Sequence, residues 1–184
     1  HLLRVPDIFT AKRAEVDEAA VWEAVSQAAK EALSSFGAMR EAEGSRLKAD
    51  LLNKLDGIEA LLAQVEEKAP QLRQEYYDRL YQRLSEVLQD KNIDETRLVT
   101  EAAIFADRVA VDEETVRLKS HLHQFREFLE SDGPIGKKLD FLIQEMNRET
   151  NTIGSKAQNL AIAKVVVEMK SEIEKIREQI QNIE

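Results

Sequence analysis

The sequence contains very few residues that break helices, with six glycines and three prolines among 184 residues. Together they make up about 5% of the chain, whereas these two residue types usually account for about 12% of a protein. A strand-rich fold needs a turn about every 8–12 residues, and glycine and proline build many of those turns. We therefore predict an all-α fold made of long helices.

Apolar side chains recur every three or four residues along two stretches, which is the spacing of one face of an α-helix. The segment QDKNID at residues 89–94 separates the stretches, Pro70 interrupts the first, and Asp94 suits the start of the second. Two long helices joined by a short turn must run antiparallel. We predict an elongated antiparallel helical hairpin over residues 38–130. Pro70 either kinks its first helix or opens a second helix, and we favour the kink. The clearest apolar positions of the hairpin are Leu47, Leu51, Leu55, Ile58, Leu62 and Val65, then Ile104, Val111, Leu118, Leu122, Phe125 and Leu129.

The segment SDGPIG at 131–136 ends the hairpin, and we predict a last long helix from about Lys137 to Ile183. Its apolar residues alternate spacings of four and three, which is typical of a seam packed against another helix. That helix belongs either to a partner subunit or to the chain's own hairpin, and we favour the hairpin. Residues 1–37 are predicted to form a linker and a short helix, which at Gly37 either ends or continues through a weak position. Residues 131–184 are the third segment. The seam residues are Ile162, Val166, Met169, Ile173, Ile176, Ile180 and Ile183.

If the last helix is unbroken, its buried stripe changes from aliphatic to polar toward the N-terminus. Buried polar groups are costly unless they find partners. The change therefore marks either the end of the core or the wall of a functional site, although Gly154 can also interrupt the register. The polar positions on this stripe are Asn159, Ser155, Thr152, Arg148 and Glu145.

The composition excludes several classes of function. The net charge of −9 argues against non-specific binding to nucleic acid or anionic lipid. No apolar run approaches the roughly 20 residues of a membrane span, and the absence of cysteine excludes thiolate catalysis and disulfides. There is no phosphate-binding loop, dinucleotide turn or serine-nucleophile motif. We expect a cytoplasmic protein that uses no small-molecule cofactor and, because the chain starts at His1, a fragment of a longer protein.

Two predicted helical segments contain side chains that can carry chemistry. His121 and His123 are two residues apart, so they point to different sides of a helix and cannot share a metal ion. Glu145 and Glu149 are four apart and share a face, and a carboxylate pair of this kind can hold Mg²⁺ or Mn²⁺. A lone helical histidine and an acidic pair are also common features without function.

The block GKKLDFLIQEMNRETNTIGSK at 136–156, with the closing REQIQNIE at 177–184, resembles the C-terminal signature of the bacterial YicC/YloC family. The resemblance covers residues 30–184 closely and 1–29 loosely. It implies an endoribonuclease that cuts RNA with a divalent metal, Mn²⁺ or Mg²⁺, and assembles into homo-oligomers, namely hexamers. We expect the N-terminal domain of the family to be absent from this chain. Further matching positions are Arg40, Glu41, Glu43, Gly44, Arg97, Leu98, Glu101, Arg108, Glu113, Glu114, Arg117, Leu118 and His121.

The resemblance also implies roles for the matching residues. One position departs from the family, because the acidic residue usual two positions after Arg108 is replaced by Ala110. Either a metal-activated water or the 2′-oxygen of RNA, with His121 as base, can attack phosphorus. The implied catalytic residues are His121, Glu114 and Glu149, the implied metal ligands are Glu113, Asp140, Glu145 and Glu149, and the implied RNA contacts are Arg108, Arg117, Lys137, Lys138, Arg148, Asn151 and Lys156.

The turn at 131–136 places these residues opposite one another. His121 and Glu145 each lie about twelve residues from its centre, or about 18 Å along antiparallel helices. We therefore predict that His121 meets Glu145, Arg148, Glu149 and Asn151 in one cleft. A buried layer of salt bridges without a ligand is the structural alternative. The functional alternative is a non-catalytic helical oligomerisation domain, with RNA bound by the N-terminal domain.

Overall fold

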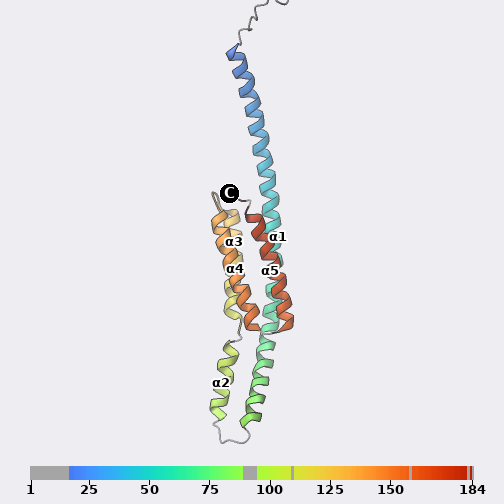
Figure 1. The fold of residues 1–184 in the computed structure, drawn as a ribbon, viewed down its shortest axis with the longest axis vertical. Helices are drawn as coiled ribbons and strands as arrows, with labels where there is room; N and C mark the ends of the chain where they lie inside the picture. The colour runs from blue at the N-terminus through green and yellow to red at the C-terminus, as the bar shows by residue number, and fades with distance from the viewer. Residues whose placement is uncertain (1–16, 89–94, 109, 158, 182, 184) are drawn as a thin grey trace, which may run out of the picture. The chain divides into compact units, whose positions relative to one another are not determined.

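A computed structural model of the chain describes residues 17–88, 95–108, 110–157, 159–181 and 183, without the side chains of residues 84, 87, 88, 95, 97, 98 and 105–108. The described part forms five helices and contains no strand, which confirms the predicted all-α fold (Figure 1). The helices are α1 (Glu18–Leu88), α2 (Glu95–Arg108), α3 (Asp112–Glu130), α4 (Gly136–Ala157) and α5 (Leu160–Ile180).

The chain divides into two units, residues 1–45 and 46–184, and α1 contributes to both. In the first unit Asp17 caps α1 by accepting hydrogen bonds from the backbone N–H groups of Ala19 and Ala20. The helix continues through Gly37 and Pro70, so the short helix of residues 1–37 is part of a longer one and the second alternative at Gly37 is the one observed. A glycine costs a helix only about 1 kcal/mol relative to alanine. That cost does not end a helix whose neighbouring residues are mostly good helix formers.

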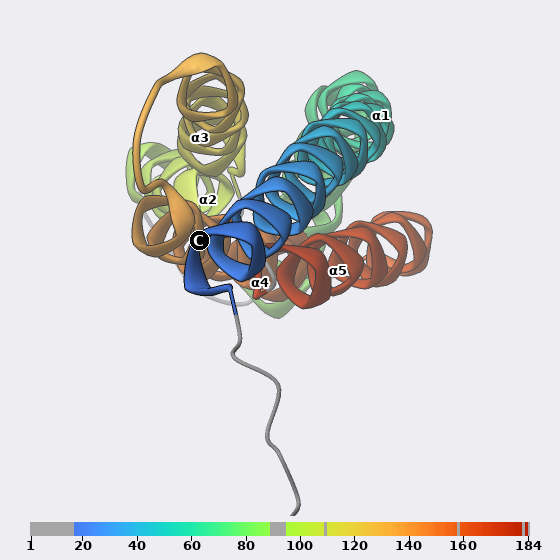
Figure 2. The ribbon, with the colours of Figure 1, turned by 90° about the horizontal axis from the view of Figure 1, so that it is seen from above.

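The second unit is a bundle of α3, α4, α5 and the part of α1 from residue 46 onward, arranged around one apolar core (Figures 1 and 2). α4 packs against both α3 and α5, and the side-chain amide of Gln179 on α5 donates a hydrogen bond to Asp50 on α1. α1 and α3 run antiparallel as predicted, because residue numbers fall along α3 as they rise along α1. Their ion pairs are Lys48–Glu130 (2.8 Å), Asp56–Arg126 (2.7 Å), Glu66–Lys119 (2.7 Å) and Arg73–Asp112 (2.5 Å).

The second helix of the predicted hairpin is in fact two helices, α2 and α3. The chain leaves the helical conformation at Ala110 and Val111. α3 then begins with Asp112, Glu113 and Glu114, and the positive end of the helix dipole stabilises acidic side chains in a first turn. This acidic triplet is the sequence signal for a new helix start. Asp94, the predicted start of the second helix, lies outside the described residues.

The predicted last helix is also divided, into α4 and α5, which lie side by side and antiparallel. The side-chain oxygen of Asn159 caps α5 by accepting hydrogen bonds from the N–H groups of Ala161 at 2.7 Å and Ile162 at 3.3 Å. The heptad seam from Ile162 to Ile180 is buried in the chain's own core, as predicted. Because α5 starts anew, its register does not continue into α4.

Candidate functional site at the α3–α4 interface

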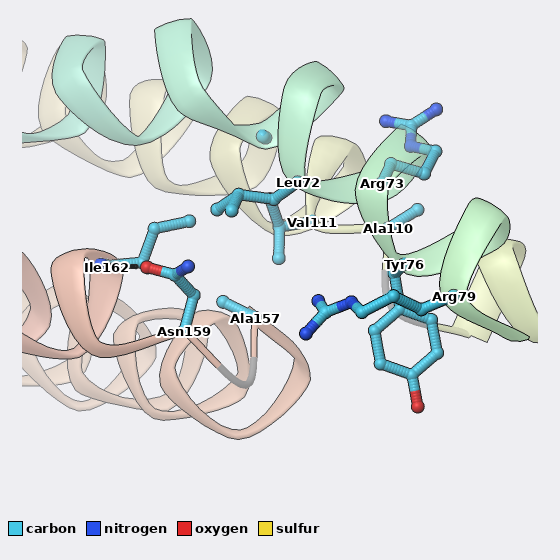
Figure 3. Close-up of a pocket in the computed structure, with 10 residues that line it drawn as sticks. Leu72, Arg73, Tyr76, Arg79, Ala110, Val111, Ala157, Asn159 and Ile162 are labelled. Carbon is cyan, nitrogen blue, oxygen red and sulfur yellow. Dashed lines mark hydrogen bonds between the residues drawn. The ribbon is translucent and has the colours of Figure 1, made fainter.

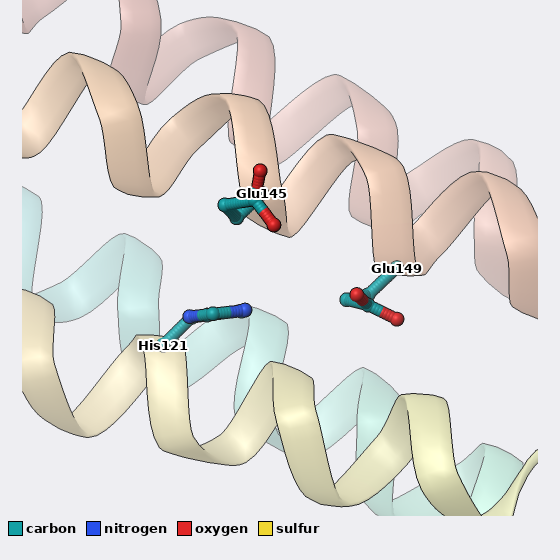
Figure 4. Close-up of side chains that lie close together, drawn as sticks. All are labelled: His121, Glu145 and Glu149. Carbon is teal, nitrogen blue, oxygen red and sulfur yellow. The ribbon is translucent and has the colours of Figure 1, made fainter.

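A short loop between α3 and α4 sets which side chains face each other. It contains Gly133 with a φ of +94°, a backbone conformation that side-chain-bearing residues rarely adopt. In an antiparallel pair, residues equally far from the loop come to lie opposite each other. His121 on α3 therefore lies opposite Glu145 and Glu149 on α4, as predicted (Figure 4).

These three side chains form a compact group. One potential ligand atom from each of His121, Glu145 and Glu149 lies within 4.8 Å of those of the other two. Glu149 is only 3% exposed, whereas His121 and Glu145 are half-buried. The group therefore combines an imidazole and two carboxylates at the edge of the core, reachable from solvent on one side.

Two arginines border the group, and neither fully neutralises it. Arg117 Nη1 lies 3.8 Å from Glu149 Oε1, while another nitrogen of the same guanidinium bonds Glu113. Arg148 Nη1 lies 3.6 Å from Glu145 Oε2 and its side chain is largely exposed. His121 Nδ1 is buried, and no group in the described part of the chain bonds it. This arrangement can accept a cation between the carboxylates and an anion beside the guanidinium groups.

A second buried glutamate, Glu114, lies on the same face of α3 as His121. Glu114 is 4% exposed and accepts a hydrogen bond of 2.6 Å from Lys156 Nζ on α4. Its other oxygen and the hydroxyl of Thr150 are buried without partners in the described residues. Lys156, which the family resemblance assigns to RNA, is thus held by a protein carboxylate.

Several of the implied site residues lie away from this group. Glu113 and Asp140 are exposed and belong to no cluster of three or more metal-ligating side chains in the described part of the chain. Asn151 is exposed and about 200° round α4 from Glu149, so the prediction that it meets His121 is wrong. Lys137 and Lys138 are exposed in the first turn of α4. Arg108 ends α2, and its side chain is outside the described part.

The predicted polar stripe on the last helix does not form the buried face of α4. Arg148 and Ser155 are exposed, and the prediction fails because it carried one helical register across the junction of α4 and α5. Thr150 is fully buried, and the prediction missed it. The residues that α4 buries are Leu139, Leu142, Ile143, Met146, Glu149, Thr150 and Ile153.

A pocket lies where α1 passes the start of α3 and the junction of α4 and α5 (Figure 3). Arg73, Tyr76 and Arg79 of α1 line one side of it, and Ala157 and Asn159 line the other. These α1 residues are not among the site residues predicted from the sequence. The available signal was the concentration of all three tyrosines of the chain at positions 76, 77 and 81, among three arginines.

Comparisons with known proteins agree with the resemblance noted from the sequence. Residues 65–184 match the family model described as endoribonuclease YicC-like, C-terminal, and residues 1–49 match the one described as endoribonuclease YicC-like, N-terminal region. The prediction that the N-terminal part of the family is absent is therefore corrected, because residues 1–49 carry a recognisable portion of that region.

Two curated relatives align over the whole chain. The probable endoribonuclease YicC of Clostridioides difficile (strain 630) is 45% identical, and the alignment covers 63% of that protein. The probable endoribonuclease YicC of Haemophilus influenzae (strain ATCC 51907 / DSM 11121 / KW20 / Rd) is 37% identical, with 62% of its length covered. The chain thus spans about three fifths of the length of these relatives. Among the described residues, none of the helices has the length and apolar character needed to cross a membrane.

Proposed function

This chain belongs to the endoribonuclease YicC-like family, and on that premise we propose that it is the RNA-cleaving region of a metal-dependent endoribonuclease. The observation that carries the proposal is the group formed by His121, Glu145 and Glu149 on facing helices. Both relatives are named probable endoribonuclease YicC, and each of them is longer than this chain.

The donor set fits a divalent cation such as Mn²⁺ or Mg²⁺. Carboxylate oxygens suit both ions, and an imidazole nitrogen beside them favours Mn²⁺. The buried and unbonded Nδ1 of His121 and the buried carboxylate of Glu149 are the observations that support the fit. A cation held here supplies Lewis-acid polarisation of a phosphoryl oxygen. Glu145 and Glu149 are the residues that would hold it.

The surrounding side chains suit the remaining tasks. The guanidinium groups of Arg117 and Arg148 flank the carboxylates and can bind a phosphate by charge-assisted hydrogen bonds. His121 lies within the same group and can take the proton from a 2′-hydroxyl that attacks phosphorus. Glu114 contacts Lys156 instead of this group, so we assign it the positioning of Lys156.

The family resemblance extends this proposal to the location and assembly of the protein. We propose that the complete protein is a cytoplasmic homo-hexamer. Size-exclusion chromatography with light scattering on the complete protein tests the assembly, with a sixfold mass as the expected result. A monomer at micromolar concentration would contradict it.

A second candidate function is a non-catalytic assembly domain. Apolar side chains on the first part of α1 favour it, because they lie on one face of the helix and are 50–73% exposed. The net charge of −9 is also unfavourable for RNA binding by the chain as a whole. The exposed apolar residues are Val21, Trp22, Val25, Leu33, Phe36 and Met39.

Cleavage of a hairpin RNA, with and without Mn²⁺, tests the catalytic proposal. His121→Ala and Glu149→Gln should each lower the cleavage rate at least about a hundredfold, which is typical of lost acid–base or metal assistance. Circular dichroism should show both variants folded. His123→Ala is the matched control, because His123 is 74% exposed on the other side of α3.

Three results would separate the alternatives. Normal cleavage by both site variants would place the chemistry elsewhere in the chain. Unfolding of both would favour a structural salt-bridge layer. Cleavage by a full-length member of the family, but not by this chain, would favour the assembly function.

A further inference from the structure

The C-terminal part of α1 carries an unusual set of side chains for an acidic protein. All three tyrosines of the chain and three of its arginines lie between residues 73 and 83. Arg73, Tyr76, Leu80 and Arg83 follow one another at spacings of three, four and three, so they share one side of α1. Arg79 lies one turn after Tyr76 and adjoins that side. We call these five residues the Arg–Tyr face.

The Arg–Tyr face borders two adjoining hollows. Arg73, Tyr76 and Arg79 line the pocket beside Ala157 and Asn159, and Tyr76, Arg79, Leu80 and Arg83 line the next one. Figure 3 shows the guanidinium of Arg79 extended across the pocket toward Ala157, while Arg73 turns away from it. The surface is therefore recessed, and a guanidinium points into the recess.

Charge and aromatic character coincide on this face. The guanidinium carbon of Arg79 lies 5.6 Å from the centre of the Tyr76 ring, and Arg79 Nε donates a hydrogen bond to the carbonyl oxygen of Glu75. Asp112 partly neutralises Arg73 at 2.5 Å. The acidic side chains of Glu75 and Asp78 accept hydrogen bonds from Gln71 and Gln74, respectively. Asp78 thus lies along another side of the helix, whereas Glu75, four residues before Arg79, adjoins the Arg–Tyr face with its carboxylate bonded to Gln71.

The pocket is close to the candidate catalytic group along the same helices. Ala157 lies eight residues after Glu149 on α4, and Asp112 lies nine residues before His121 on α3. At about 1.5 Å per residue, both separations are about 12–14 Å. A strand of RNA with its reacting phosphate at the candidate group can therefore extend along α3 and α4 to the pocket.

We propose that the Arg–Tyr face binds a single-stranded segment of RNA next to the bond that is cut. Arg79, and Arg83 beside it, contact backbone phosphates, and the ring of Tyr76 stacks on a base. Tyrosine rings combined with arginines in a groove are the usual means of holding single-stranded nucleic acid without reading its sequence. The choice of RNA as ligand rests on the proposed function.

The test measures binding separately from cleavage. The whole chain is titrated into a fluorescein-labelled single-stranded RNA of about 12 nucleotides in EDTA, and the fluorescence anisotropy is recorded at several salt concentrations. Tyr76→Ala should raise Kd at least about fivefold, and Tyr76→Phe should restore most of the affinity because it keeps the ring. Arg79→Ala should raise Kd and reduce the slope of log Kd against log salt concentration by about 0.7, the value for one phosphate contact on a single strand.

Two comparisons make the result specific. Lys170→Ala removes one positive charge from the exposed side of α5 and should leave Kd and the salt slope as in the unmodified chain. An RNA duplex of the same sequence should lose less affinity than the single strand in Tyr76→Ala, because its bases are already stacked. Melting temperatures of all variants are recorded. If Tyr76→Ala is destabilised, Arg79→Ala decides the matter, because that side chain is exposed.

The outcomes keep this inference apart from the proposed function. Unchanged binding in Arg79→Ala and Tyr76→Ala alike, or equal losses for single strand and duplex in Tyr76→Ala, would overturn the Arg–Tyr face even if the chain cleaves RNA. Weakened binding in Arg79→Ala, in a chain that does not cleave RNA, would support the face and leave the nuclease proposal refuted.

Discussion

Two glutamates on facing helices, Glu114 and Glu149, are almost fully buried, although carboxylates are among the side chains least often found inside proteins. Their surroundings differ. The ammonium of Lys156 lies 2.6 Å from Glu114, whereas the nearest cation to Glu149 among the described residues, Arg117, is 3.8 Å away and also bonds Glu113. Glu114 is therefore suited to a structural role, and Glu149 to holding an added cation.

The Glu114–Lys156 pair leads to a prediction about stability. Lys156→Met leaves a buried carboxylate without its partner and should lower the free energy of unfolding by about 2–4 kcal/mol. Replacing both residues, in Glu114→Gln with Lys156→Met, should recover much of that loss because no unpaired charge remains. Urea unfolding followed by circular dichroism measures both.

A matched lysine provides the control for this prediction. Lys48 pairs with Glu130, which is exposed, so Lys48→Met should cost less than about 1 kcal/mol. Equal losses in Lys48→Met and Lys156→Met would show that the burial of Glu114 has no energetic consequence.

Helix ends decide the geometry of the site at the scale of secondary-structure elements. α3 ends and α4 begins at the loop around Gly133, and this places His121 opposite Glu145. α4 and α5 are separate because Asn159 caps a new helix instead of continuing the old one. The start of α4 is also tightly placed, since a Cβ atom at Gly136 would lie 2.8 Å from the backbone oxygen of Ile183.

Alanine at Gly136 and alanine at Gly57 should change the stability in opposite directions, because only Gly136 lies close to other backbone atoms. Gly136→Ala should lower the free energy of unfolding by about 1–3 kcal/mol, because backbone must shift to admit the methyl group. Gly57→Ala, in the interior of α1 with nothing within 4 Å of the new Cβ, should raise it by about 0.5–1 kcal/mol through helix propensity. Thermal unfolding of both variants checks the signs. A stabilised Gly136→Ala would contradict the contact with Ile183.

At the scale of the whole molecule, the site depends on tertiary packing between two helices. His121 and Glu149 are 28 positions apart, and only the folded α3–α4 pair brings their ligand atoms within 4.8 Å. A cation held by Glu145 and Glu149 within this group therefore binds the folded chain and not the unfolded one. Binding of this kind adds to the stability of the entire second unit.

Mn²⁺ should therefore raise the melting temperature. At a concentration 100 times Kd, a single site contributes about 2.7 kcal/mol, which corresponds to about 5–10 °C for a chain of this size. Differential scanning fluorimetry with and without Mn²⁺ measures the shift. Glu145→Gln and Glu149→Gln should abolish most of it, because these two carboxylates would hold the cation, and His123→Ala should retain it. A shift that survives in both site variants would place the metal elsewhere.

The spacing of apolar residues and the position of one loop account for much of the fold and site that could be predicted from the sequence. The periods of three and four at Leu47–Val65 and Ile162–Ile180 identified the faces that are buried, and the short loop at 131–136 identified His121 and Glu145 as opposite neighbours. Prediction failed at Ala110 and at the junction of α4 and α5, and it left Gly37 undecided, because the energies that continue or end a helix at such positions differ by only about 1 kcal/mol. A competition that close is settled by packing of distant segments.

The sequence by itself determined that the chain is helical, which faces are apolar and which family it resembles, because these depend on the order and spacing of residues along one strand of chain. Only the tertiary structure decided that Glu149 and Thr150 are buried while Arg148 and Asn151 are exposed. It also decided that Lys156 serves Glu114, and that Tyr76 and Arg79 adjoin the α4–α5 junction. Each of these depends on where helices end and on which helix packs beside which, and those choices are set by the free energy of the whole bundle.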